Sequence, residues 1–412
     1  MKDVIVIGGG IIGLCAAEKL VSQGHEVTII EKDRIAAGAS YGNAAGFAFS
    51  EVMPMASYTT ILQSLRWIMD PAGPFSIIPQ DLPYTLNWLI RFALASRKST
   101  FEQSLRVQAK LMQLGKTTLP QMLERTNLDK MVNTTGALYL YDTKSQYLAA
   151  QKSWRLRQKY DVEYECYQGS ELHRYQPGLA NNIFGGIHSP NFQLVSNPND
   201  FCLAIHKHIQ PNAVATIYHN VVGLTPKEGR VEVALQGADS LMADKVIIAA
   251  GPWSGELSRA LGDNVPLTGE RGYNTTLPKS ALPDLTRTIF FAPHGFVIAP
   301  LADGVRVGGA SEIARLDRPA NYKRSDALLR KAKALVPELQ LTDGEQWMGI
   351  RPTTPDTLPV IGTASRHPNV IYAFGHGHLG LTQATATAQL IYEIVSGQKR
   401  SIDPDSLSAS RF

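Results

Sequence analysis

Three glycines near the start of the chain have the Gly-x-Gly-x-x-Gly spacing of a nucleotide-binding turn: Gly8, Gly10 and Gly13. The β-branched run 3–7 predicts a strand before the turn. The stretch 12–23 predicts a helix after it, and a second strand over 26–30 ends at Glu31. In this context the glycines let the backbone approach a pyrophosphate, and the N–H groups that open the helix face its charge. Glu31 can accept hydrogen bonds from a ribose diol, so we predict a dinucleotide site here.

A second chemical candidate is Arg351, in the sequence Gly-Ile-Arg-Pro over 349–352. Because a residue before proline favours extended backbone, the Arg351 side chain can project from a strand-like segment. A structural ion pair is the alternative. Near the C-terminus, the glycine-rich turn 375–382 precedes a predicted helix over 383–395, which again places a helix N-terminus where a ligand can bind. His376 and His378 in this turn lack a neighbouring third ligand, so we do not predict a metal site.

Two further segments have small residues where a ligand can approach the backbone. The loop 38–46 contains Ser40 and Asn43 as donors, and the buried run 244–251 ends in Ala-Ala-Gly, as parallel strands do beside a ligand. Each segment alone also fits a plain loop or core strand. The segment 54–98 predicts two apolar helices near cations, which either pack on a sheet or touch a membrane surface.

Composition limits the function classes. The 412 residues are enough for two domains, and a net charge of +4 with scattered cations does not indicate nucleic-acid binding. The three cysteines are isolated, which argues against an iron–sulfur cluster, a zinc site or a disulfide framework: Cys15, Cys166 and Cys202. No apolar run is long enough to span a bilayer. We expect a cytoplasmic protein. The segment 54–98 suggests, as an alternative, that the protein associates with the inner face of the cell membrane.

Taken together, these segments resemble the FAD-dependent D-amino acid oxidase and dehydrogenase family, which includes glycine oxidase and sarcosine oxidase. The likeness is greatest to the bacterial D-amino acid dehydrogenases. It implies a mixed α/β fold with a discontinuous, Rossmann-like FAD-binding domain and a substrate domain built on an antiparallel sheet. The implied FAD-binding domain comprises 1–53, 195–262 and 345–412, and the implied substrate domain comprises 54–194 and 263–344.

The resemblance also implies roles for individual residues. Arg351 binds the substrate carboxylate, and Tyr273 either bonds the substrate or is a core tyrosine. Arg271, His294 and Phe296 are weaker pocket candidates. The residues implied to bind FAD are Gly8, Gly10, Ile11, Ile12, Gly13, Glu31, Lys32, Ser40, Asn43, Gly46, Val221, Ala250, Gly251, Trp253, Gly377, His378, Leu379, Gly380 and Thr382. Because the cysteine that holds flavin covalently in sarcosine oxidases has no counterpart here, we expect non-covalent FAD.

The implied reaction is hydride transfer from the Cα of a D-amino acid to flavin N5, with the electrons passed to a quinone-like acceptor. A cyclic substrate such as D-proline or hydroxy-D-proline fits the aromatic pocket candidates. Two alternatives stay open at this point. One is an oxidase of glycine, sarcosine or a similar amine that uses oxygen, and the other is a tRNA-modifying or non-catalytic flavoprotein.

Overall fold

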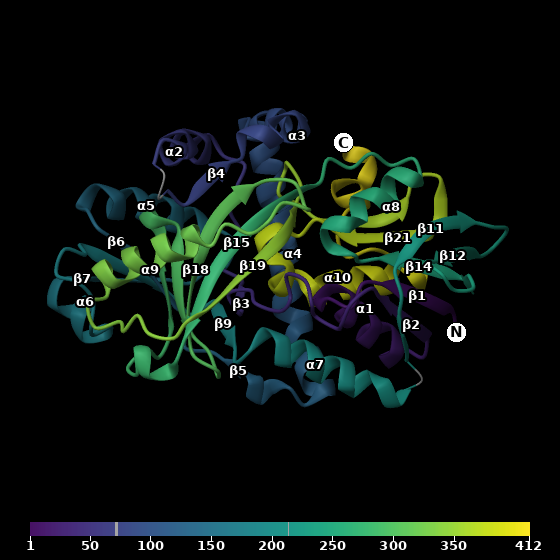
Figure 1. The fold of residues 1–412 in the computed structure, drawn as a ribbon, viewed down its shortest axis with the longest axis horizontal. Coiled ribbons are helices and arrows are strands. Elements are labelled where there is room, and N and C mark those ends of the chain that lie inside the picture. The colour runs from purple at the N-terminus through teal and green to yellow at the C-terminus, as the bar shows by residue number, and fades with distance from the viewer. Residues whose placement is uncertain (71–72, 213) are drawn as a thin grey trace.

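The β-branched runs form a six-stranded sheet in the computed structural model, which describes residues 1–70, 73–212 and 214–412. Five strands are parallel, and β20 at one edge runs antiparallel to β21. In spatial order the strands are β10 (Ala215–Tyr218), β2 (Glu26–Glu31), β1 (Asp3–Ile7), β14 (Lys245–Ile248), β21 (His367–Phe374) and β20 (Val360–Ala364). The sheet therefore joins segments from the beginning, middle and end of the chain (Figure 1).

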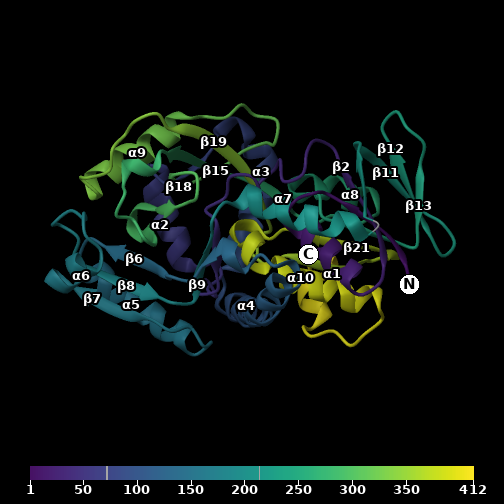
Figure 2. The same ribbon diagram turned by 90° about the horizontal axis from the view of Figure 1, so that it is seen from below.

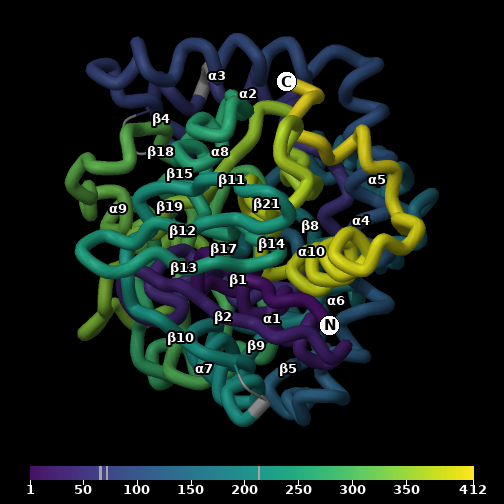
Figure 3. Tube along the Cα trace, turned by 90° about the vertical axis from the view of Figure 1, so that its right-hand side faces the viewer, coloured from purple at the N-terminus to yellow at the C-terminus, as the bar shows by residue number. Residues whose placement is uncertain are grey.

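Helices and a small sheet cover this six-stranded sheet. Helices α1 (Ile11–Ser22) and α10 (Gly380–Val395) pack against the sheet and each other, and α4 (Lys98–Thr126) and α7 (Pro198–Ile209) pack outside them (Figure 2). A second core contains residues of the sheet together with residues of a three-stranded sheet and of α8. These elements are β11 (Val221–Pro226), β12 (Val231–Leu235), β13 (Leu241–Ala243) and α8 (Ser254–Ala260). Figure 3 views the molecule from their side.

The second large sheet has nine strands and is mostly antiparallel. Its main path is β19 (Glu345–Thr353), β15 (Thr268–Leu277), β18 (Val305–Ile313), β17 (Phe296–Pro300), β16 (Thr288–Phe291), β6 (Ala137–Tyr141), β8 (Gly185–Ser189) and β7 (Glu165–Gln168), with β4 (Phe75–Ile77) on β18. Alternation along β6 directs Leu138 and Leu140 to one core and Tyr139 and Tyr141 to the other. The core that contains Leu138 and Leu140 also includes residues of α6 (Gly169–Tyr175) and α9 (Lys323–Leu335). The core that contains Tyr139 and Tyr141 includes residues of α5 (Lys144–Gln158).

A short third sheet contains the end of the 38–46 loop. It consists of β3 (Gly46–Ala48), β9 (Phe192–Val195) and β5 (Val132–Asn133). Two further helices, α2 (Tyr58–Ile68) and α3 (Leu82–Ala95), lie near β4 at the top of Figure 1. They confirm the two helices predicted within 54–98, and Pro83 occupies a first-turn position of α3 that suits proline. Residues 71–72, between these helices, lie outside the described residues.

The predicted fold class is confirmed: the chain is mixed α/β, with a parallel sheet and a separate, largely antiparallel sheet. The division into an FAD domain and a substrate domain remains a proposal, and one boundary needs correction. Strand β19 was placed in the FAD domain, but it pairs along its whole length with β15 of the nine-stranded sheet. We therefore propose that the last FAD-domain segment begins after Thr353.

Candidate active site

A cavity of about 1810 Å³ is lined by residues from both large sheets. Ordinary small-molecule pockets measure roughly 300–1,000 Å³, so this space is large enough for more than one small ligand. Apart from the weaker pocket candidates, which are treated below, all but two of the residues predicted to bind FAD or substrate line the cavity. The exceptions are Gly13, which packs against the Gly8 carbonyl, and Thr382, whose hydroxyl accepts a hydrogen bond from the Ala48 N–H at 2.9 Å.

The N-terminal turn is built by short-range contacts. Gly8 has φ +114°, and a Cβ there would lie 2.4 Å from the Ala249 carbonyl oxygen, so only glycine fits. Glu31 accepts the Gly9 N–H at 2.7 Å, and Ser40 accepts the Ile11 N–H at 2.9 Å. A carboxylate has more lone pairs than the bonds made here use, so Glu31 retains capacity for a ribose hydroxyl.

The loop 38–46 is fixed from the nine-stranded sheet. Asn274 of β15 donates to the Gly42 carbonyl at 2.6 Å, and Arg306 of β18 donates to the Asn43 carbonyl at 2.8 Å. The Asn43 side chain accepts the Ala45 N–H at 2.8 Å and so braces the loop from within. Burial lowers the pKa of the Arg306 guanidinium. Neither Asn274 nor Arg306 was singled out in the sequence, since their role depends on pairing across the two sheets.

Arg351 lies in β19 directly opposite Glu270 of β15. Its Nη1 is 2.9 Å from Glu270 Oε1 and donates to the Ala310 carbonyl at 3.2 Å, while Nε and Nη2 carry three further N–H donors. The guanidinium lies against the backbone of Gly272, where a Cβ would be only 2.1 Å from Arg351 Nη2. The arginine side chain is 24% exposed and lines the cavity.

Glu270 is the buried centre of this group and was not predicted as a site residue. It is 2% exposed and receives hydrogen bonds from Arg351, Ser311 at 2.5 Å and Thr353 at 3.2 Å, while His378 Nε2 lies 2.7 Å from Oε1. Burial alone would raise the pKa of Glu270, but the charges of His378 and Arg351 hold it well below its usual range. The carboxylate is therefore ionised across the pH range in which enzymes work.

Tyr273 is among the residues that line the cavity, but its hydroxyl is engaged elsewhere. It donates to Glu312 at 2.7 Å and accepts the Asn321 N–H at 3.2 Å. Burial and the neighbouring Glu312 carboxylate raise the pKa of Tyr273. These contacts favour the structural alternative for Tyr273, and its bond to substrate stays a prediction.

Of the weaker pocket candidates, only Phe296 lines the cavity. His294 pairs with Asp142 at 2.7 Å. Arg271 is fully buried and donates to the carbonyls of Arg315, Arg318 and Pro319. A register shift in β15 between Arg271 and Tyr273 accompanies this difference in direction. The interpretation of Arg271 as a pocket residue was therefore wrong.

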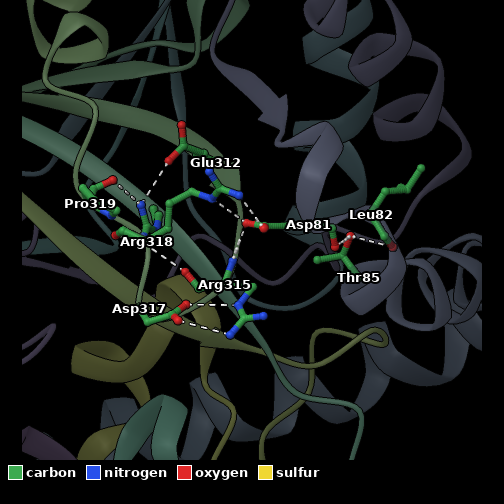
Figure 4. A network of polar contacts seen from close by, with 9 residues as sticks. Asp81, Leu82, Thr85, Glu312, Arg315, Asp317, Arg318 and Pro319 are labelled. Atoms are coloured by element: carbon green, nitrogen blue, oxygen red, sulfur yellow. Dashed lines mark hydrogen bonds and ion pairs between the residues drawn. The ribbon is translucent and has the colours of Figure 1, made fainter.

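A polar network joins the start of α3 to the segment that follows β18 (Figure 4). Asp81 accepts two bonds from Arg318, at 2.8 and 2.6 Å, and one from the Arg315 N–H at 2.9 Å. The Arg318 hydrogen bond lowers the pKa of Asp81. Because Arg271 holds the same loop from the other side, this network fixes the start of α3 to the end of β18.

The chain matches a known protein family over nearly its whole length. The family described as DAO, FAD dependent oxidoreductase, matches residues 3–394. The chain belongs to this family. It is 26% identical to a D-amino-acid oxidase of Bradyrhizobium diazoefficiens and 27% identical to a D-amino acid dehydrogenase of Chromohalobacter salexigens, each over 100% of this chain and 99% of the relative. Glycine oxidase from Geobacillus kaustophilus has the same fold, with a TM-score of 0.77, 22% identity, and coverage of 100% of this chain and 99% of that structure.

FAD is the cofactor of this family of oxidoreductases, and the residues of the cavity fit it. The glycine turn before α1 lines the cavity beside Glu31, and no side chain caps the N-terminus of α1, which suits a phosphate there. Nearby, Lys32 Nζ lies 3.4 Å from the centroid of the Trp253 ring. Glycine residues line both this end and the 377–380 turn. Within the described ranges, no three His, Cys, Asp or Glu side chains are grouped as a metal site would require.

Proposed function

We propose that the protein oxidises a D-amino acid, with a cyclic imino acid such as D-proline or hydroxy-D-proline as the preferred substrate class. The observation that carries this proposal is the position of Arg351, a braced guanidinium on the wall of a cavity large enough for FAD and a small acid. The names of the two curated relatives, both of which act on D-amino acids, agree with it.

Arg351 would orient the substrate by its carboxylate. A planar guanidinium pairs with a carboxylate through two charge-assisted hydrogen bonds, which fixes the direction of the Cα–H bond. Bound FAD would supply the two-electron acceptor for the hydride. Positioning is thus the main task of the protein side chains. The cavity-lining aromatic residues Phe290 and Trp347 would offer apolar walls for a ring-shaped substrate.

Electrons would then pass to a quinone-like acceptor, and we propose that 54–98 brings the protein to a membrane surface. Leu82, Leu86, Ile90 and Leu94 recur every four residues along α3 and are 42–52% exposed, and the exposed cations Arg97 and Lys98 follow. Such a stripe beside cations suits an interfacial helix. Trp88 on the buried side of α3 donates to the Thr353 carbonyl at 2.9 Å, next to the site. No helix in the described parts of the chain is long and apolar enough to cross a membrane.

An oxygen-using amino acid oxidase is the second candidate, because one of the two curated relatives is named an oxidase. Peroxide formation separates the two readings. Under air, a dehydrogenase oxidises substrate with little peroxide until a quinone analogue is added, whereas an oxidase releases stoichiometric peroxide without one.

The substrate proposal is tested by anaerobic titration of the FAD-loaded enzyme with a panel of D- and L-amino acids. The visible absorbance of oxidised flavin should be lost with D-amino acids, most rapidly with D-proline or its hydroxylated forms, because the flavin accepts the hydride. Bleaching by L-amino acids alone, or by amines without a carboxylate, would refute it.

A further inference from the structure

The cavity continues past Arg351 across the nine-stranded sheet. Six neighbouring strands each contribute one residue to a row of directly paired positions, and all six residues line the cavity: Trp347, Asn274, Gly308, Val297, Phe290 and Tyr139. Because directly paired residues share one face of a sheet, the cavity follows that face from β19 to β6. Arg351 donates to the Ala310 carbonyl of β18, and β6 lies three strands farther, about 14 Å away at roughly 4.8 Å a strand. A proline ring held by Arg351 therefore leaves room for a second ligand at the β6 end.

Helix α5 forms a wall of the β6 end with one of its faces. Its cavity-lining residues recur at the three- and four-residue spacing of a helix face: Gln146, Ala149, Ala150, Ser153, Trp154 and Arg157. The two alanines leave a gap between Gln146 and Ser153, which lie two turns apart, about 10.5 Å along the helix axis. Tyr139 and Tyr141 of β6, against which α5 packs, line the cavity as well. We call the space between this face of α5 and the two tyrosines the α5 slot.

The floor of the α5 slot is aromatic and firmly held. The Tyr139 ring stacks on Phe290 with the ring centroids 4.7 Å apart, and the Trp154 ring meets Tyr139 edge-on at 4.9 Å. The Trp154 N–H donates to the Tyr141 hydroxyl at 3.3 Å. Aromatic rings fixed in this way pack well against another flat ring, either stacked or edge-to-face.

Each end of the alanine gap carries a hydrogen-bond donor. Gln146 Oε1 accepts the N–H groups of Asp142 and Thr143 at 3.1 Å each, which fixes the orientation of the amide and leaves Nε2 as the donor. Ser153 Oγ accepts Arg157 Nη1 at 2.6 Å, so its own O–H can donate to a ligand. Within the described part of the chain, neither Gln146 Nε2 nor the Ser153 hydroxyl donates to another residue.

The charges beside the slot cancel. Arg157 Nη2 pairs with Glu51 at 3.3 Å, and Glu51 also accepts the Tyr139 hydroxyl at 2.9 Å. The slot thus combines aromatic surface with two donors and carries no net charge. This combination suits a neutral, flat ring with an acceptor oxygen at each end.

The slot reaches the surface of the molecule, where apolar side chains lie. Ala149 is exposed, and three residues of α2 also line the cavity at helical spacing: Thr59, Gln63 and Trp67. Tyr58 and Leu62, on the neighbouring stripe of α2, are 68% and 47% exposed. An apolar tail on the ring can therefore leave the cavity along α2, within the segment 54–98 that we propose meets a membrane.

We propose that the α5 slot binds the quinone-like electron acceptor, with Gln146 Nε2 and the Ser153 hydroxyl donating to its two carbonyl oxygens. The inference rests on the proposed function, because it takes the acceptor to be a quinone. In the net reaction the amino acid gives up its Cα–H and one N–H as two electrons and two protons. These end on the two quinone oxygens, so the products are one imino acid and one quinol. The amino acid and the acceptor thus have separate places in one cavity.

The first test measures binding to the oxidised, FAD-loaded enzyme, titrated by calorimetry with duroquinone (tetramethyl-1,4-benzoquinone). Ala149→Phe fills the slot from an exposed position of α5 and should weaken duroquinone binding about tenfold or more. The matched control is Leu148→Phe, at a neighbouring exposed position that does not line the cavity, and it should bind as the wild type does. Ser153→Ala removes one donor and should weaken binding about two- to tenfold. If Ala149→Phe does not fold, Ser153→Ala decides.

The second test separates the acceptor from the substrate by rapid mixing. Enzyme reduced with one equivalent of dithionite should be reoxidised by duroquinone about tenfold more slowly in Ala149→Phe than in the wild type, whereas its reduction by a D-amino acid should keep its rate within about twofold. Leu148→Phe should match the wild type in both directions.

Wild-type duroquinone binding in Ala149→Phe and Ser153→Ala would overturn the inference. A slower reduction by D-amino acids in Ala149→Phe, with or without slower reoxidation, would overturn it as well, because the slot would then serve the substrate. If no D-amino acid reduces the flavin but the dithionite-reduced variants show the expected loss, the acceptor site stands and the proposed substrate fails. If D-amino acids reduce the flavin but duroquinone does not bind the wild type, the substrate stands and the acceptor site fails.

Discussion

Gly272→Ala tests how tightly the fold positions Arg351. A Cβ at residue 272 would lie 2.1 Å from Arg351 Nη2, whereas ordinary contacts begin at 3.4 Å, so the guanidinium must move by about 1.3 Å. Gly272 has no positive φ, and the obstructed atom is the end of a flexible side chain, so the melting temperature should change little. A misplacement of about 1 Å in a positioning group can cost roughly 100-fold in rate. We therefore expect kcat/KM for the best D-amino acid to fall about 100-fold.

The assay is steady-state turnover with a quinone analogue, alongside FAD content and thermal melting. In an Arg351→Ala background, Gly272→Ala should add less than about a twofold effect, because it acts through the arginine. The matched control is Gly255→Ala in α8, where the nearest atoms to a new Cβ are 3.6 and 3.7 Å away and activity should not change. Wild-type kcat/KM in Gly272→Ala, or the same loss with and without Arg351, would refute the reasoning.

Three further predictions follow from other parts of the structure. Asp81→Asn should lower the free energy of unfolding by roughly 1–3 kcal/mol at pH 7. The pKa of Asp81 in the folded protein lies below its ordinary value of 3.8, so the carboxylate stabilises the fold fully above pH 3.8. The stability difference between wild type and variant, measured by urea unfolding, should therefore shrink as the pH falls below 3.8. A difference that persists at low pH would contradict the ion-pair account. FAD should appear in the supernatant after acid precipitation, and a yellow pellet would contradict non-covalent binding. Leu86→Glu with Ile90→Glu should abolish flotation with phosphatidylglycerol vesicles, whereas Leu148→Glu, at an exposed leucine of α5, should not; an unchanged flotation of the double variant would exclude the α3 surface.

The features predicted well from the sequence are local ones. The glycine turn, Glu31, and the helices that became α1 and α10 depend on residues close together in the chain, whose patterning and capping signals are readable. Arg351 was predicted because its tetrapeptide resembles a family motif, and it lies on the cavity wall, while its role toward substrate stays a prediction. The cavity unites these segments because the parallel strands end on the same side of one sheet.

The features that were missed depend on register between distant strands. Glu270 became a site residue only because β15 places it opposite Arg351, 81 positions away in the chain. Arg271 was misassigned because a register shift in β15 cannot be read from composition. The short elements β7 and α8 have four and seven residues, too few for a periodic pattern to identify.

The most direct test of the central claim is the anaerobic spectrum of the purified holoenzyme with a D-amino acid, recorded for wild type and Arg351→Ala. The account predicts a yellow protein whose flavin is reduced by D-amino acids, with reduction at least about 100-fold slower in the variant, since two charge-assisted bonds to the carboxylate are lost. A wild-type flavin that D-amino acids do not reduce, or a variant reduced at the wild-type rate, would contradict it.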